Sequence, residues 1–62
     1  MVAIKEIRKS MNMTQAELAV LCNTTPATIC RYETGERVPD LETAAKIADA
    51  LHCKLDDLIK ED

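Results

Sequence analysis

The segment from Gln15 to Thr34 constrains the fold most strongly, because its residues predict two short helices on either side of a tight bend. Thr14 and Glu17 have the spacing of a capping box, in which the threonine hydroxyl accepts a backbone N–H and the glutamate reaches back to the cap. Met13 and Leu18 occupy the hydrophobic staple positions around this cap. A helix is therefore expected to begin directly after Thr14.

The bend and the second helix of the segment are marked by equally local features. Asn23 stands where the first helix must end, and asparagine tolerates the left-handed backbone of such exits. Thr25 is a favourable N-cap, and Pro26 suits the first helical position, where a backbone N–H would have no helical partner. Gly35 is a natural C-terminal stop. The sequence thus predicts a helix from Pro26 to Thr34.

Hydrophobic spacing predicts three further helices and no strand, which places the chain in the all-α class with five helices. Asp40 is expected to cap the fourth helix, whereas Lys54 is a poor cap for the last. The residues expected to face the core, helix by helix, are Ile4, Ile7 and Met11; Leu18, Leu21 and Cys22; Ile29 and Tyr32; Leu41, Ala44, Ala45, Ile47, Ala48 and Leu51; and Leu55, Leu58 and Ile59.

Two short helices across a tight bend are the arrangement with which proteins fit an α-helix to a DNA groove, and the second helix carries Arg31 beside small side chains. The net charge of −3 is unusual for a DNA-binding protein. From Met1 to Arg37, however, five cations stand against four anions, whereas from Val38 onward three cations stand against seven anions. The acidity therefore lies away from this helix, and we expect few phosphate contacts and weak binding to random DNA.

The composition limits the class of protein. A chain of 62 residues supports one domain with a small core, expected over residues 1–62. There is no long apolar run and no apolar centre of a signal sequence, so we expect a cytoplasmic protein that does not enter a membrane. Three cysteines, an odd number, argue for reduced thiols. They lack C-x-x-C spacing, and although His52 beside Cys53 hints at a metal site, no metal or other cofactor is expected.

Six residues in a fixed order resemble the Cro and phage-repressor type of helix-turn-helix proteins, the XRE family. They are Gln15, Ala19, Ile29, Glu33, Gly35 and Pro39. The resemblance extends from Ile4 to Ile59 and implies a five-helix, lambda-repressor-like domain whose second and third helices form the helix-turn-helix. It also implies sequence-specific binding of double-stranded DNA and regulation of transcription, usually as a dimer.

The resemblance implies a set of contacts to the sugar–phosphate backbone. These contacts are expected from Gln15, Thr25, Thr34, Arg37 and the backbone of Gly35. Glu36 departs from the family pattern, because a carboxylate at this position repels phosphate. Gln15 can also be read as an ordinary helix residue, since glutamine is a common helix former.

The resemblance also places Pro26, Ala27 and Arg31 at outward positions that face base edges, with Thr28 near the backbone or the groove floor. The guanidinium of Arg31 can bind O6 and N7 of guanine together, which is worth about 1 to 3 kcal/mol of discrimination. Ala27 can only touch a thymine methyl group. The competing interpretation of Arg31 is a solvated charge on a helix surface.

Glu33 is expected to have a structural role. At the matching family position a glutamate pairs with an arginine of the first helix, here Arg8, and Arg8 is expected to share a phosphate contact. Cys22 and Cys53 are interpreted as core residues, whereas Cys30 is expected to be partly exposed. A redox role for Cys30 lacks support, because no second cysteine lies nearby in the sequence.

We therefore expect a DNA-binding transcriptional regulator that reads the major groove as a homodimer, associating through the C-terminal region from Leu55 to Ile59. The apolar residues of that region serve the core, a dimer contact or both. The alternative is a protein-interaction module on the same scaffold, antitoxin-like or accessory, that binds a partner protein through its acidic half. An enzyme is the weakest interpretation, because the chain has one histidine, no catalytic cluster and no glycine-rich loop.

Overall fold

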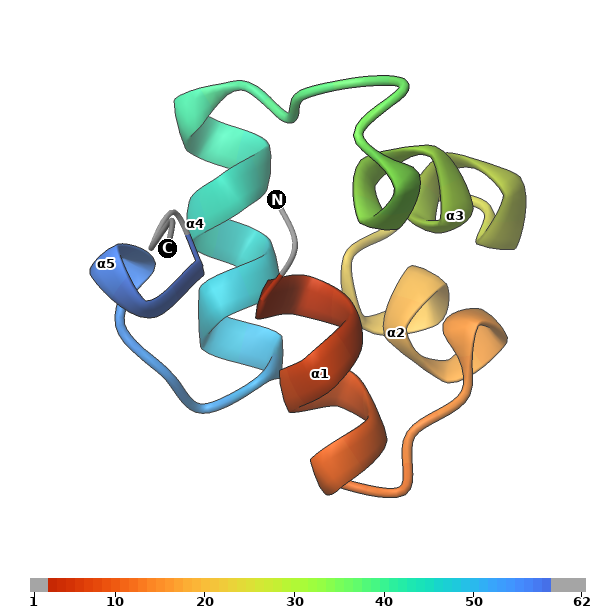
Figure 1. The fold of residues 1–62 in the computed structure, drawn as a ribbon. Coiled ribbons are helices and arrows are strands. Elements are labelled where there is room, and N and C mark those ends of the chain that lie inside the picture. Colours follow the sequence, from red (N-terminus) through yellow and green to blue (C-terminus); the bar gives the residue numbers. More distant parts are fainter. Residues whose placement is uncertain (1–2, 59–62) are drawn as a thin grey trace.

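The computed structural model describes residues 3–58, and within them the chain forms five helices and no strand, as predicted. The helices are α1 (Ala3–Ser10), α2 (Gln15–Leu21), α3 (Pro26–Thr34), α4 (Leu41–Ala50) and α5 (Leu55–Leu58). Figure 1 shows α4 beside the short α5, with α2 and α3 on the other side of the molecule. Ile59, which the sequence analysis assigned to the last helix, lies outside the described residues.

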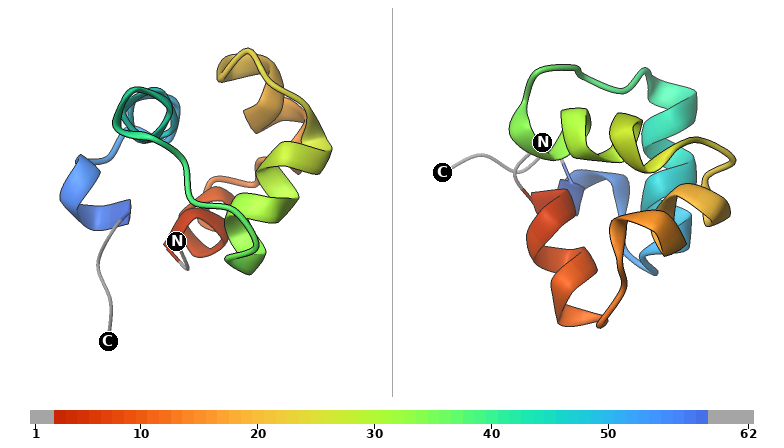
Figure 2. Two further views of the ribbon diagram at one scale, coloured as in Figure 1. Left: turned by 90° about the horizontal axis from the view of Figure 1, so that it is seen from above. Right: turned by 90° about the vertical axis from the view of Figure 1, so that its right-hand side faces the viewer.

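The helices pack so that α2 and α3 form one unit, which contacts α4 through α2 and α1 through α3. α2 contacts both α3 and α4, and α1 contacts both α3 and α5. Seen from above, α2 and α3 lie on one side and α4 and α5 on the other, joined by the extended connection between α3 and α4 (Figure 2). This arrangement leaves the outer side of α3 uncovered by any other described helix.

Local capping explains where three of the helices begin. Thr14, Thr25 and Asp40 each accept the backbone N–H three residues further on, at 3.0, 3.3 and 2.8 Å respectively. Glu17 completes the predicted capping box, because its Oε1 accepts the Thr14 N–H at 2.9 Å. Asn23 adopts the left-handed backbone that its position in the bend requires, with φ of 57°.

The core is a single cluster to which every described helix contributes. Its buried members are Ile4, Leu18, Ala19, Cys22, Ile29, Tyr32, Ile47, Ala48, Leu51 and Leu58. Ile7, Met13, Ala50, Cys53 and Leu55 are partly buried against it. Ala44 and Ala48 of α4 are both buried, as their positions predicted.

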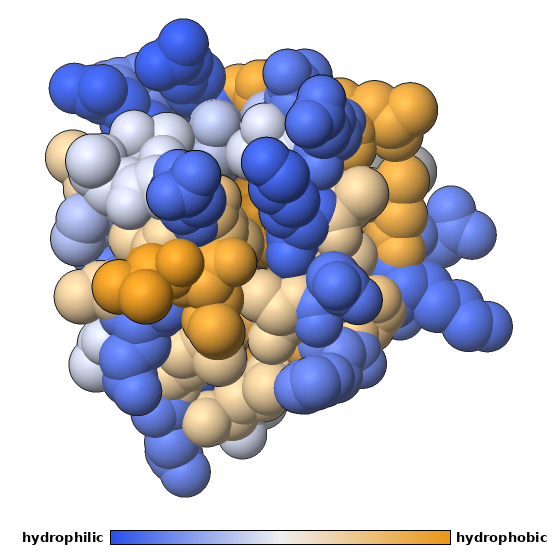
Figure 3. Space-filling view, turned by 180° about the vertical axis from the view of Figure 1, so that it is seen from behind, coloured by the Kyte–Doolittle hydropathy of each residue, from blue (hydrophilic) through white to orange (hydrophobic). Residues whose placement is uncertain are grey.

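Four residues whose spacing predicted a place in the core face solvent instead. Met11 is 36% exposed because α1 ends at Ser10 and the chain has already turned. Leu21 is 59% exposed, since Ala19 completes the inward stripe and Leu21 lies off it at the end of α2. Leu41, at the first position of α4, is 72% exposed, and Ala45 is exposed as well. Apolar patches consequently interrupt the charged surface (Figure 3).

The three thiols differ in their surroundings. Cys22 is buried, Cys53 is half-buried and Cys30 is exposed. Burial raises the pKa of the Cys22 thiol, although the charge of Lys46 acts in the opposite direction. Across residues 3–58, no group of three or more metal-ligating side chains comes together. No helix in this part of the chain combines the length and apolarity that crossing a bilayer requires.

Candidate nucleic-acid interface

The helix α3 has one face in the core and the opposite face in solvent. Ile29 and Tyr32, three residues apart, are buried and fix the orientation of the helix. Ala27 and Arg31, four residues apart and therefore on one side of the helix, are exposed. The side chains around Arg31 on this outer side are small, so Arg31 projects beyond its neighbours.

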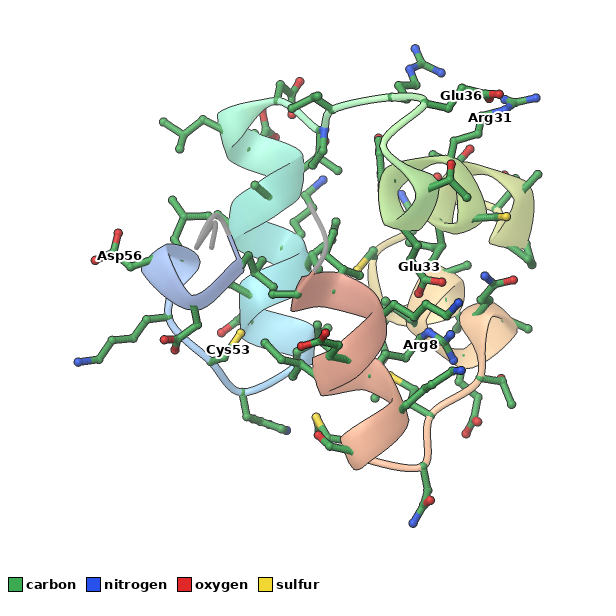
Figure 4. All side chains as sticks on the ribbon, viewed as in Figure 1. Arg8, Arg31, Glu33, Glu36, Cys53 and Asp56 are labelled. Atoms are coloured by element: carbon green, nitrogen blue, oxygen red, sulfur yellow. The ribbon has the colours of Figure 1, made fainter. Side chains whose placement is uncertain are left out.

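Arg31 extends from the end of α3 into solvent, with 51% of its side chain exposed. Its Nε lies 3.1 Å from Oε2 of Glu36, whose side chain is 69% exposed. Figure 4 shows both side chains at the outer end of α3, pointing away from the rest of the molecule. The closest approach of the Glu36 carboxylate is therefore to Nε and not to the two terminal nitrogens of Arg31. The guanidinium therefore keeps the edge that a bidentate contact uses.

A compact turn fixes the chain that follows Arg31. The carbonyl oxygen of Arg31 accepts the Thr34 hydroxyl at 3.2 Å and the Arg37 N–H at 3.2 Å. The Thr34 hydroxyl oxygen in turn accepts the Glu36 N–H at 3.4 Å. Gly35 has φ of 85°, the left-handed conformation that glycine adopts without steric cost. The turn thus holds Glu36 beside Arg31.

The N-terminal end of α3 presents two hydroxyl groups. Thr25 caps the helix, and its Oγ1 lies 2.9 Å from Oγ1 of Thr28. Thr25 is exposed and Thr28 is half-buried, with Pro26 between them exposed at the first helical position. The structure therefore brings the first residues predicted to meet DNA into one short surface segment.

Beneath this surface, a buried ion pair joins α1 to α3. Nε of Arg8 lies 2.6 Å from Oε2 of Glu33, and the side chains are 9% and 3% exposed. Arg8 also donates to Glu33 Oε1 at 3.3 Å and to the Met13 carbonyl oxygen at 2.7 Å. The expectation that Arg8 shares a phosphate is not supported, because its guanidinium is buried and bound to these partners.

Gln15 connects α2 to the same pair. Its Nε2 donates to Oε1 of Glu33 at 2.9 Å, so Glu33 ties three helices together. Burial by itself raises the pKa of Glu33, but hydrogen bonds from Arg8 and Gln15 and the charges of Arg8 and Lys5 outweigh it and hold the pKa below its usual value. Glu33 is therefore a carboxylate at neutral pH.

Two of these relationships could not be read from the sequence alone. The contact between Gln15 and Glu33 depends on how α2 meets α3, and residues 18 positions apart carry no local rule that predicts it. The pair of Arg31 with Glu36 crosses the end of a helix, where the i, i+4 rule for side-chain pairs no longer applies. This second pair becomes visible only once the turn at Gly35 is known.

Comparisons with known proteins agree with this geometry. A family model described as helix-turn-helix matches residues 4–58. The chain is 41% identical over 51 residues to the cryptic phage CTXphi transcriptional repressor RstR of Vibrio cholerae, a match covering 82% of this chain and 46% of that protein. It is 38% identical over 53 residues to multiprotein-bridging factor 1b of Arabidopsis thaliana, covering 86% of this chain and 37% of that protein. This chain thus spans half the length of these relatives or less.

A solved structure shares the whole arrangement of helices. The P22 c2 repressor, in a crystal structure with synthetic operator 9T and Tl⁺, superposes with a TM-score of 0.88 at 30% sequence identity. The match covers 95% of this chain and 89% of the repressor chain. The fold is accordingly the lambda-repressor-like, five-helix one. The chain belongs to the XRE family of helix-turn-helix DNA-binding regulators.

Proposed function

We propose that this protein binds double-stranded DNA sequence-specifically, places the outer face of α3 in the major groove and regulates transcription. The observation that carries the proposal is the exposed guanidinium of Arg31, which projects from α3 beside the small side chain of Ala27. A helix face with small side chains can approach the base edges closely. The two terminal nitrogens of the guanidinium can then donate to O6 and N7 of one guanine.

Contacts to phosphates on both sides of α3 would set the register. Thr25 and Thr34 carry exposed hydroxyl groups near the two ends of the helix, and Arg37 is exposed just beyond it. Nε2 of Gln15 has two hydrogens, of which one is directed to Glu33, so the second remains for a phosphate oxygen. These contacts position the protein without reading sequence.

We propose further that two copies bind a two-fold operator. Half-sites one helical turn apart have a spacing of about 34 Å, and the longest extent of this molecule is 26 Å, so neighbouring copies fit side by side. The C-terminal region is the proposed contact. In its described part Leu58 is buried, but Leu55 borders an open hollow that Ala45, Ala48 and Cys53 also line.

In-vitro selection from a randomised duplex pool tests this function directly. Enrichment of one motif containing guanine, repeated with two-fold symmetry, is the expected result. A pool that stays random after several rounds would contradict sequence-specific binding. Enrichment of a single half-site would support the proposed base contact and contradict binding as a homodimer.

A second candidate function is a protein-interaction module on the same scaffold. Its support is the consecutive exposed pair Val20 and Leu21 on α2, next to open hollows lined by Met13 and Glu17 on one side and by Lys46 and His52 on the other. One relative is named a multiprotein-bridging factor. Retardation of labelled DNA in excess random competitor supports the first function; capture of a partner protein without any DNA affinity supports the second.

A further inference from the structure

We infer that Glu36 is a specificity-determining residue, which restrains Arg31 from phosphates while leaving it able to contact a guanine. This inference rests on the proposed DNA-binding function and adds a role for a residue that contacts no base. It follows from the position of one carboxylate relative to one guanidinium.

The contact is made on one particular edge of the guanidinium. Oε2 of Glu36 lies 3.1 Å from Nε of Arg31, the nitrogen nearest the backbone. The two terminal nitrogens, which reach furthest from α3, are the donors that bind guanine end-on. Pairing at Nε therefore leaves the base-reading edge open.

The turn after α3 keeps Glu36 in place. Its backbone N–H donates to the Thr34 hydroxyl, and the Arg31 carbonyl oxygen accepts from both Thr34 and Arg37. These bonds fix the backbone of Glu36 close to Arg31, and from this position its carboxylate reaches Nε of Arg31.

The same carboxylate opposes a contact between Arg31 and phosphate. On random DNA an exposed arginine normally binds the nearest phosphate, and this contact releases counterions. Here such a contact would bring phosphate close to the Glu36 carboxylate, and the repulsion between the two negative groups disfavours it. An exposed pair is weak, so Glu36 biases Arg31 rather than locking it.

A bias of this kind raises the ratio of specific to non-specific binding. On the operator, guanine O6 and N7 are neutral acceptors, and Glu36 does not repel them as it repels phosphate. On random DNA the phosphate contact is suppressed. Discrimination therefore increases even though Glu36 adds no contact to DNA.

The test compares Glu36→Gln with the unaltered protein on two duplexes, one recovered by in-vitro selection and one with the same composition in scrambled order. We expect the variant to bind the scrambled duplex about threefold to fivefold more tightly, because the repulsion between the Glu36 carboxylate and phosphate is removed. Its slope of log affinity against log salt concentration should steepen by about 0.9, the value for one added phosphate contact. On the selected duplex, affinity should change less than about twofold.

Two further variants separate this role from a general charge effect. Glu6→Gln removes the same charge by the same substitution from an exposed position on α1, outside the proposed DNA-binding and dimer surfaces, and should leave both affinities nearly unchanged. Glu36→Gln combined with Arg31→Ala should behave as Arg31→Ala alone, because the effect acts through Arg31.

Each contrary result has a distinct meaning. Equal effects of Glu36→Gln on both duplexes, or an undiminished effect when Arg31 is alanine, overturn the inference and leave the proposed function intact. If selection enriches no sequence, the proposed function fails, and the specificity role of Glu36 fails with it.

Discussion

Arg8 and Glu33 are 25 positions apart in the sequence, yet Nε of Arg8 lies 2.6 Å from Oε2 of Glu33 inside the molecule. The pair sets α3 against α1, while Gln15 of α2 donates to the same carboxylate. The orientation of the exposed face of α3 therefore depends on an interaction buried beneath it. Glu33 thus contributes to the packing of three helices and to the orientation of α3.

Glu33→Gln should strongly destabilise the fold. Removing one partner of a buried ion pair leaves the other charge uncompensated, at a cost of about 3 kcal/mol. A domain of this size has a total stability of roughly 3 to 9 kcal/mol, so urea denaturation should show about a third or more of it lost. The matched control is Glu42→Gln, whose exposed pair with Lys46 has an N–O distance of 4.0 Å. A loss no larger than the control's would show that the buried pair is not a principal stabilising contact.

The same carboxylate should make the protein sensitive to acid. The pKa of Glu33 in the folded state lies below its ordinary value of 4.5, so the unfolded chain binds protons more readily. The stability contributed by Glu33 is therefore fully present above about pH 4.5 and is lost as the pH falls through the folded-state pKa. Unfolding free energies measured between neutral pH and pH 3 should fall, with a smaller fall in Glu33→Gln.

The stability of Glu33→Gln should still fall at low pH, because two other carboxylates also have lowered pKa values. The pKa values of Glu17 and Asp40 are also lowered, by hydrogen bonds within their caps with Thr14 and Thr43 respectively. Identical pH profiles for the two proteins would contradict the role given to Glu33.

Gly35→Ala should destabilise the protein through its backbone alone. Nothing lies within 4 Å of a Cβ atom added to Gly35, so no steric collision occurs, but φ of 85° is unfavourable for alanine. The expected loss is about 1 kcal/mol, and Gly35→Asn should lose less because asparagine tolerates this conformation. Thermal unfolding compares the three proteins. Equal melting temperatures would mean that the left-handed turn does not form.

Neighbouring leucines on α2 should respond very differently to truncation. Leu18 is fully buried, so Leu18→Ala should cost about 2 to 5 kcal/mol of unfolding free energy. Leu21 is largely exposed, so Leu21→Ala should cost less than about 0.5 kcal/mol. Denaturant titration of both variants tests the corrected orientation of the helix. Similar losses would place Leu21 in the core, as its sequence position first suggested.

The sequence predicted the parts of this fold that depend on neighbouring residues. Caps at Thr14, Thr25 and Asp40 use hydrogen bonds three residues long, so their local sequence is sufficient to identify them. The left-handed positions at Asn23 and Gly35 were predictable for the same reason. The number and order of the helices were also predictable, because the spacing of apolar residues reveals the 3.6-residue period of an α-helix.

The choice of buried residue within each helix was harder to predict. A chain of 62 residues has a core too small to bury all its apolar side chains. In α2 and α4 the alanines Ala19 and Ala44 are buried, whereas the leucines Leu21 and Leu41 are exposed. Hydrophobicity favours the leucines, whereas the packing of α2 against α3 and α4 selects the alanines. Contacts between helices therefore determine which apolar residues of a helix are buried.

In the candidate site, too, features set within one helix were predictable, and contacts beyond that helix were not. Exposure of Arg31 followed from the inward positions of Ile29 and Tyr32 on the same helix. Its pairing with Glu36 did not follow, because it depends on the path of the turn after Thr34. The assignment of phosphate and base contacts to particular residues remains a prediction, since it concerns a second molecule.

The binding of Arg31→Ala to the selected and scrambled duplexes tests the central claim most directly. If Arg31 reads a guanine, the variant should lose about 5- to 150-fold in affinity for the selected duplex, equivalent to about 1 to 3 kcal/mol, and less than about twofold for the scrambled one. Circular dichroism should show the helices unchanged. Equal losses on both duplexes would make Arg31 a phosphate contact and contradict sequence reading by α3.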